Sequence, residues 1–145
     1  MLFRSVRGMN ILVAYDFTPA AGRALAWAAN FQRSRGATLH VLNVLDPVPP
    51  MSAAVAAPLL EPDVVGTESA LRRVLDAADA TGTVQCVLSP LPGEAIVQVL
   101  QERQPDLVVV GTHGREGLTR VLLGSVAEYV IRHADVPVLT LRVAG

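Results

Sequence analysis

Short apolar runs alternate with helix-forming stretches along the whole of this 145-residue chain. Runs rich in β-branched residues are typical of buried strands, and apolar residues at helical spacing between them predict helices that pack on a sheet. The pattern predicts strands at 10–15, 38–45, 83–88, 107–110 and 137–143, and helices at 19–35, 65–80, 92–103 and 126–133.

Strands that alternate with helices predict an α/β fold: a single open, doubly wound parallel sheet of five strands with helices on both faces. Such sheets bind ligands at the carboxyl ends of the strands, where the winding direction reverses. We assume the strand order 3-2-1-4-5, which places the reversal between the first and fourth strands. Asp16 ends the first strand and Gly111 to Gly114 follow the fourth, so both should lie at one crevice.

The glycines after the fourth strand predict a phosphate site. The apolar run stops at Gly111, Gly114 follows, and the pair Gly124-Ser125 precedes the next helix, with Ser125 as its predicted N-cap. Glycines let the backbone approach a ligand closely, and a helix N-terminus presents unpaired N–H groups to an anion. The alternatives are that the glycines serve only a tight turn and that Ser125 caps the helix without any ligand. Asp16 could likewise only cap the first helix or pair with an arginine.

Composition excludes several classes of function. All twelve basic residues are arginine, so a P-loop and lysine Schiff-base chemistry are excluded. A net charge of −1 gives no electrostatic reason to bind nucleic acid or an anionic membrane, and no apolar run approaches the roughly 20 residues of a membrane span. The single cysteine, Cys86, rules out an intrachain disulfide and indicates a cytoplasmic protein.

One domain should span residues 1–145. The first nine residues are expected to be an N-terminal extension, because Met9 is an alternative start. Residues 47–62 contain five prolines and predict an irregular loop, which could be a lid, a partner contact or an insertion. The histidines 40, 113 and 133 are scattered and predict neither a metal site nor a catalytic base; His113 is expected to orient its loop.

With the spacing Gly111-x2-Gly114-x9-Gly124-Ser125, and with Asp16 at the end of the first strand, the chain resembles the universal stress protein family. It is similar to the ATP-binding branch, whose signature is G-x2-G-x9-G-[ST]. The resemblance covers nearly the whole chain and implies an adenine nucleotide alpha hydrolase-like fold.

The resemblance implies how an adenosine would be held. Asp16 would accept hydrogen bonds from the adenosine, and Ala14 would lie near the base. Val44 would offer its backbone to the adenine edge, while Val110 and Gly111 would line the ribose.

The resemblance also implies a phosphate-binding set. Gly114, Gly124, Ser125 and Val126 would bind the phosphates through backbone N–H groups and the serine hydroxyl, and Arg115 could reach the outermost phosphate. A Mg²⁺ or Mn²⁺ ion would bridge phosphate oxygens, although no dedicated set of protein ligands is evident.

Three functions follow as hypotheses. The first is a cytoplasmic ATP-binding regulatory protein of the stress response, in which nucleotide occupancy changes a homodimer or a partner surface. The second is a slow ATPase or self-phosphorylating enzyme, and the third is a nucleotide-free dimeric scaffold. The dimer is expected to form through strand 136–143, which is apolar on both faces and lies at a sheet edge in the assumed order.

Overall fold

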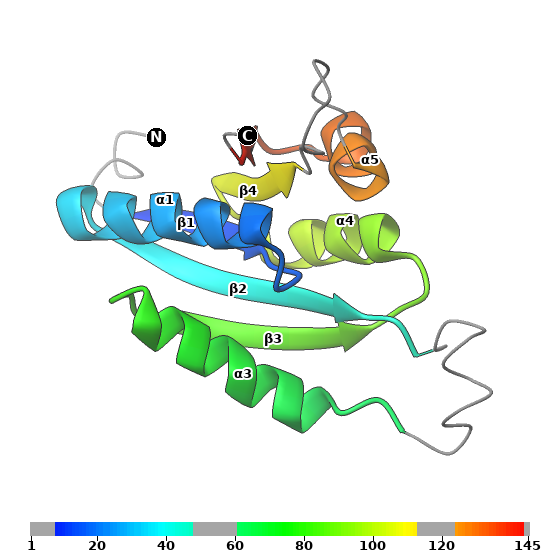
Figure 1. Cartoon of the computed structure of the whole chain (residues 1–145). Coiled ribbons are helices and arrows are strands. Elements are labelled where there is room, and N and C mark those ends of the chain that lie inside the picture. Colours follow the sequence, from blue (N-terminus) through cyan, green and yellow to red (C-terminus); the bar gives the residue numbers. More distant parts are fainter. Residues whose placement is uncertain (1–7, 48–60, 113–123, 144–145) are drawn as a thin grey trace.

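The computed structural model describes residues 8–47, 61–112 and 124–143, and within them five strands form one parallel sheet (Figure 1). The strand order is β3-β2-β1-β4-β5, as assumed from the sequence. The strands are β1 (Met9–Ala14), β2 (Ala37–Leu45), β3 (Gly82–Leu88), β4 (Leu107–Thr112) and β5 (Val138–Arg142). The predicted fold class is therefore confirmed.

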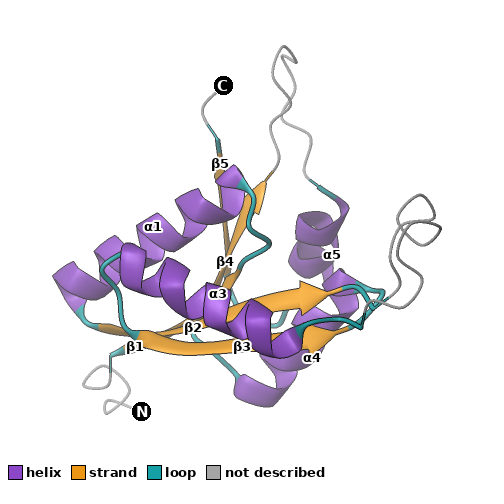
Figure 2. Cartoon of the chain, turned by 60° about the horizontal axis from the view of Figure 1, so that its bottom comes forward, coloured by secondary structure: helices purple, strands orange, loops and turns teal. Residues whose placement is uncertain are grey.

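Helices cover both faces of the sheet (Figure 2). They are α1 (Pro19–Arg35), α3 (Val64–Ala77), α4 (Pro92–Arg103) and α5 (Ser125–His133). Helices α1 and α3 pack on one face around a buried cluster that includes Val13, Leu25 and Leu71. Helices α4 and α5 pack on the other face around Leu12 and Val108. The sheet is thus buried between two helical layers, as expected of parallel strands.

Local sequence signals explain where α1 begins and ends. The Thr18 hydroxyl accepts a hydrogen bond from the Ala21 N–H at 3.2 Å, and Pro19 takes the first helical position. Gly36, at φ 71°, ends the helix in a left-handed conformation that glycine adopts at no steric cost. The N-cap and the end of this helix were both predicted from the sequence.

Several predicted boundaries were wrong by one to three residues. β4 does not stop before Gly111 but continues through Thr112, because Gly111 and Thr112 pair with residues of β5. Helix α3 ends at Ala77 rather than Ala80, where Asp79 takes a left-handed turn at φ 54°. Most of the predicted loop 47–62 lies outside the described residues.

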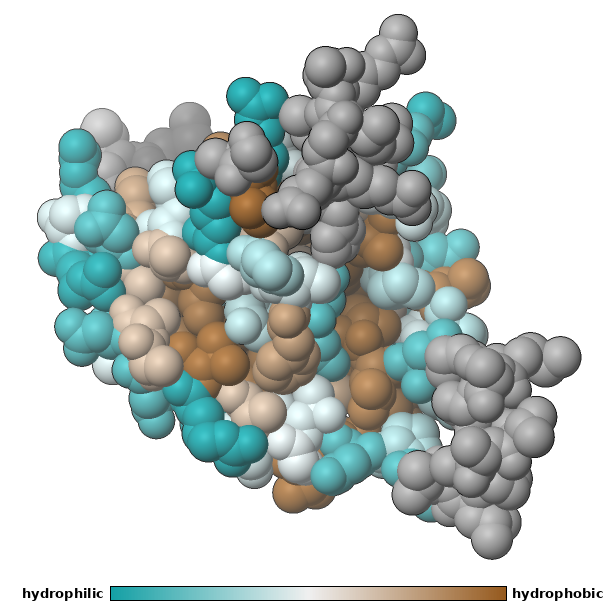
Figure 3. Space-filling model, viewed as in Figure 1, coloured by the Kyte–Doolittle hydropathy of each residue, from teal (hydrophilic) through white to brown (hydrophobic). Residues whose placement is uncertain are grey.

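The surface of the described part is mixed in character. Hydrophilic and hydrophobic residues are interspersed on the face that carries α1 and α3 (Figure 3). Val65 on α3 is 77% exposed and Phe17 before α1 is 46% exposed. No helix among the described residues combines the length and apolar character that a membrane span requires.

Candidate functional site

A pocket of about 290 Å³ opens at the carboxyl ends of the strands, where the winding direction of the sheet reverses. Its walls come from the ends of β1, β2 and β4 and from the first turns of α1, α4 and α5. The lining residues are Ala14, Tyr15, Asp16, Ala21, Leu42, Val44, Pro92, Ile96, Val110, Gly111, Ser125, Val126 and Ala127. The structure therefore brings strand ends and helix starts to one place.

Seven of the ten residues singled out from the sequence line this pocket: Ala14, Asp16, Val44, Val110, Gly111, Ser125 and Val126. Gly124 directly precedes them as the N-cap of α5. Gly114 and Arg115, together with His113, lie outside the described residues. The pocket joins motif residues that are more than 100 positions apart in the sequence, since Ala14 and Ser125 both line it.

Sequence reasoning missed part of the lining, notably Leu42, Pro92, Ile96 and Ala127. Leu42 precedes Val44 by two residues on the same face of β2, so strand alternation could have identified it. Ala127 is the third residue of α5 and follows from the position of the helix start. Nothing in the local pattern indicates the contribution of α4.

The start of α5 differs from the prediction by one residue. Gly124, at φ −62° and ψ 154°, is the N-cap, and Ser125 is the first helical residue instead of the cap. Within the described part of the chain, no side chain caps this helix, and its first backbone hydrogen bond runs from the Glu128 N–H to the Gly124 carbonyl at 3.0 Å. The N–H groups of Ser125, Val126 and Ala127 therefore have no acceptor inside the helix, and all three residues line the pocket.

The turn between β1 and α1 holds Asp16 at the pocket wall. The Asp16 Oδ1 atom accepts hydrogen bonds from the Thr18 N–H, at 3.1 Å, and from the Thr18 hydroxyl. Thr18, rather than Asp16, is the N-cap of α1, and Asp16 supports the helix start through Thr18. These hydrogen bonds hold the carboxylate beside the pocket.

Gly111 has a structural reason to be glycine. A Cβ atom at this position would lie 2.4 Å from the carbonyl carbon and oxygen of Ala20, in the first turn of α1. Gly111 therefore allows β4 and α1 to approach closely, within a strand rather than in the tight turn considered from the sequence. It also lines the pocket, so packing and exposure to a ligand coincide at one residue.

The pocket combines an apolar wall with an electropositive end. Leu42, Val44, Ile96 and Val110 supply aliphatic surface. The first turn of α5 supplies N–H groups at the positive end of a helix dipole. Burial, and secondarily the negative charge of Asp16, raises the pKa of Tyr15, so this phenol stays neutral. Such a pocket suits an apolar group that carries an anion.

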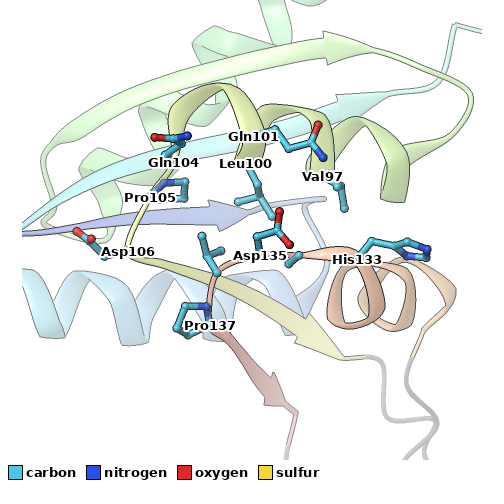
Figure 4. Close-up of a pocket in the computed structure, with 11 residues that line it drawn as sticks. Val97, Leu100, Gln101, Gln104, Pro105, Asp106, His133, Asp135 and Pro137 are labelled. Atoms are coloured by element: carbon cyan, nitrogen blue, oxygen red, sulfur yellow. The ribbon is translucent and has the colours of Figure 1, made fainter.

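Larger hollows lie at the amino ends of the strands. One, of about 420 Å³, lies between the last turns of α4 and α5 and is lined by Gln104, Asp106, His133 and Asp135 among others (Figure 4). Helix C-termini are electronegative and do not favour anions. No group of three or more histidine, cysteine, aspartate or glutamate side chains suited to a metal ion occurs in the described segments.

Comparison with known proteins gives matches to one protein family. Residues 9–142 match the model of the universal stress protein family. Universal stress protein MJ0531 of Methanocaldococcus jannaschii is 31% identical over 141 residues, which cover 92% of this chain and 81% of that protein. A universal stress protein of Thermus aquaticus is 34% identical over 147 residues, covering 92% and 98% of the two chains.

Solved structures agree on the fold. Universal stress protein UspA from Lactobacillus plantarum superposes with a TM-score of 0.69 at 29% identity, covering 94% of this chain and 99% of that one. The universal stress protein from Archaeoglobus fulgidus in complex with dAMP gives 0.62 at 27% identity, covering 91% and 96%. A universal stress protein in complex with cAMP gives 0.65 at 25% identity, covering 94% and 98%.

Proposed function

This chain belongs to the universal stress protein family, and on that premise we propose that its carboxyl-end pocket binds an adenine nucleotide, with ATP as the ligand. The observation that supports this most directly is the first turn of α5: its three N–H groups have no acceptor within the helix, and their residues line the same pocket as the aliphatic residues of β2 and β4. Similar proteins were solved with dAMP and with cAMP.

The adenosine would lie against the ends of β1, β2 and β4. Asp16 accepts hydrogen bonds from the sugar or base, next to Ala14, and the backbone of Val44 faces the adenine edge. Val110 and Gly111 border the ribose. The aliphatic surface of these strand ends removes the base from water, which contributes roughly 25 cal/mol for each Å² of apolar surface buried.

The phosphates would lie at the start of α5. The N–H groups of Ser125 and Val126, the Ser125 hydroxyl and the backbone of Gly124 face the anion, and Gly114 and Arg115 complete the set. The described residues offer no protein cage for a metal, so Mg²⁺ or Mn²⁺ would be held chiefly by phosphate oxygens and water, as Mg²⁺ commonly is at nucleotide sites.

The nucleotide would act as a regulatory signal in a stress response rather than as the substrate of a fast enzyme. We propose a homodimer that pairs through the segment 136–143, because β5 is an edge strand with Leu139 and Leu141 on one of its faces, and an apolar edge is normally paired or covered. We place the protein in the cytoplasm, which agrees with a single, buried free thiol at Cys86.

Calorimetric titration with Mg-ATP tests the proposal, after extraction has shown that no nucleotide co-purifies. The matched control is Gly124→Val, because φ −62° and ψ 154° suit any residue while the added side chain crowds the phosphates. If the original chain binds Mg-ATP and Gly124→Val does not, the proposal is supported. An empty, folded chain that does not bind would refute it and leave the nucleotide-free scaffold. Phosphate release, or phosphate transfer to the protein, that Ser125→Ala abolishes would favour the slow enzyme.

A further inference from the structure

A buried amide lies directly behind the turn that carries Asp16. The Asn43 side chain, near the carboxyl end of β2, is 6% exposed. Its Nδ2 atom donates a hydrogen bond to the Tyr15 carbonyl at 2.8 Å, and its Oδ1 atom accepts one from the Cys86 thiol at 3.8 Å. Burying an amide costs free energy unless it is hydrogen-bonded, and here both ends of the amide have partners.

Asn43 completes a two-sided hold on the residue before Asp16. The Tyr15 N–H donates to the Leu42 carbonyl at 2.8 Å, and the Tyr15 carbonyl accepts from Asn43. Both backbone polar groups of Tyr15 are therefore bound to β2 after β1 has ended at Ala14. The backbone is fixed up to the residue from which the Asp16 side chain projects.

The turn that follows contains a strained residue. Phe17 has φ 63°, a left-handed conformation that is an outlier for a bulky side chain and costs on the order of 1 kcal/mol or more. Thr18 holds the Asp16 carboxylate on one side of Phe17, and Asn43 holds Tyr15 on the other. We expect that, if either hold is lost, the turn relaxes and Asp16 leaves the pocket wall.

The thiol supports the amide from behind. Burial raises the pKa of Cys86, with a further increase from the nearby Glu68, against a smaller lowering from a hydrogen bond with Thr67. The thiol therefore stays protonated and can donate to the Asn43 oxygen. The NH₂ end of the amide is then directed toward Tyr15, where it donates to the carbonyl oxygen.

We propose that Asn43 is a positioning residue for nucleotide binding: its buried amide holds Tyr15 and thereby sets Asp16 for the adenosine. The inference rests on the proposed function of the pocket and adds a residue that does not itself line it. Asn43 acts through Asp16, so its effect on affinity exists only while Asp16 is present.

A double-mutant cycle tests this dependence. Mg-ATP is titrated calorimetrically into the full chain and into Asn43→Leu, Asp16→Ala and the double variant. Asn43→Leu should weaken binding about tenfold, the equivalent of one hydrogen bond's worth of positioning. In the double variant the loss should equal that of Asp16→Ala alone, because two residues of one network are not additive.

The control is Gln32→Leu, which removes another bracing amide. Gln32 donates to the Ala37 and Thr81 carbonyls at the opposite end of the sheet, both at 2.9 Å. This variant should lose stability to urea as Asn43→Leu does but keep the affinity for Mg-ATP, which separates positioning from general destabilisation. If Asn43→Leu does not fold, Asn43→Ser replaces it in the same cycle.

The outcomes distinguish the two proposals. An unchanged chain that binds no Mg-ATP would refute nucleotide binding itself. Binding by the unchanged chain, with the same affinity in the folded Asn43 variant, would overturn only the positioning role. Losses that add in the double variant would overturn it as well, since Asn43 would then act independently of Asp16.

Discussion

The two ends of the sheet differ in what lies beside their backbone polar groups. At the amino end, side chains bind the backbone groups that the elements leave open. Gln32 makes three such hydrogen bonds, to the Ala37 carbonyl and to both polar groups of Thr81, each at 2.9 Å. Arg33 donates to the Ala78 carbonyl at the end of α3, also at 2.9 Å. At the amino end, protein side chains therefore occupy these backbone groups.

At the carboxyl end, the first three residues of α5 line a pocket. No side chain among the described residues caps their N–H groups. The bracing side chains, Asn43 and Thr18, hold the neighbouring turn between β1 and α1. Two hollows at the amino end are larger than the pocket, about 420 and 610 Å³ against 290 Å³. Helix N–H groups without an acceptor in their own helix, beside an apolar wall, therefore distinguish the proposed binding end, and volume does not.

The largest expected effect is at the closest backbone approach of the carboxyl end. Gly111→Ala places a Cβ atom 2.4 Å from the backbone of Ala20, and backbone cannot rotate away as a side chain can. We expect the free energy of unfolding to fall by about 3 kcal/mol, the upper part of the range for overpacked sites. Urea denaturation followed by circular dichroism measures it. An unchanged midpoint would show that α1 does not rest against β4 as closely as the geometry requires.

A smaller loss should come from opening the amino end. Gln32→Leu removes three hydrogen bonds to backbone groups, and we expect a loss of about 2 kcal/mol in the free energy of unfolding, reduced because water can reach part of the site. The affinity for Mg-ATP should not change. A weakened affinity would break the comparison, because it would mean that the two ends of the sheet are coupled.

The sequence predicted the architecture because its signals are local and repeated. Thr18, Pro19 and Gly36 mark the ends of α1, and apolar runs mark each strand. The assumed strand order then brought Asp16 and Gly111 to the same pocket. The boundary of β4 was less predictable, since Gly111 interrupts the β-branched run while pairing with β5 continues through Thr112.

The remaining features depend on how distant elements meet. Gly111 is constrained by Ala20, and the part of the pocket wall formed by Pro92 and Ile96 depends on how α4 lies on the sheet. Neither relation is encoded in a short pattern. The buried position of Asn43 could have been predicted from the sequence. It is a polar residue on the core-facing side of β2, in alternation with Leu39 and Val41.

The pH dependence of stability tests the amino end through the protonation of His40. His40 is buried on β2, and its ring nitrogens contact Thr83 at 2.6 Å and Gln85 at 2.8 Å. Burial lowers its pKa from the usual 6.5; the hydrogen bond that the ring donates to the Gln85 Oε1 atom opposes the decrease, and the charge of Arg103 adds to it.

The unfolded chain therefore binds a proton at His40 more readily than the folded chain does. The stability contributed by the neutral ring is complete above about pH 6.5 and is lost as the pH falls below that value. His40→Gln should remove this decline between about pH 6.5 and 5, above the range where carboxylates titrate. Urea midpoints measured across the window decide it, and an equal decline in both proteins would assign the effect to other groups.

The smallest effect, and one of opposite sign, is expected at Gly22. This glycine lies in the second turn of α1, close to the pocket, yet a Cβ atom there would have no heavy atom within 4 Å. Because alanine is favoured over glycine inside a helix, Gly22→Ala should raise the free energy of unfolding by about 1 kcal/mol and leave Mg-ATP binding unchanged. Together with Gly111→Ala, this variant compares the effect of one added methyl group in β4 with that of one added methyl group in α1. A loss of stability at Gly22 would show that the tight packing at the carboxyl end extends to the outer side of α1, and would remove the distinction between a closely seated strand and an open helix surface.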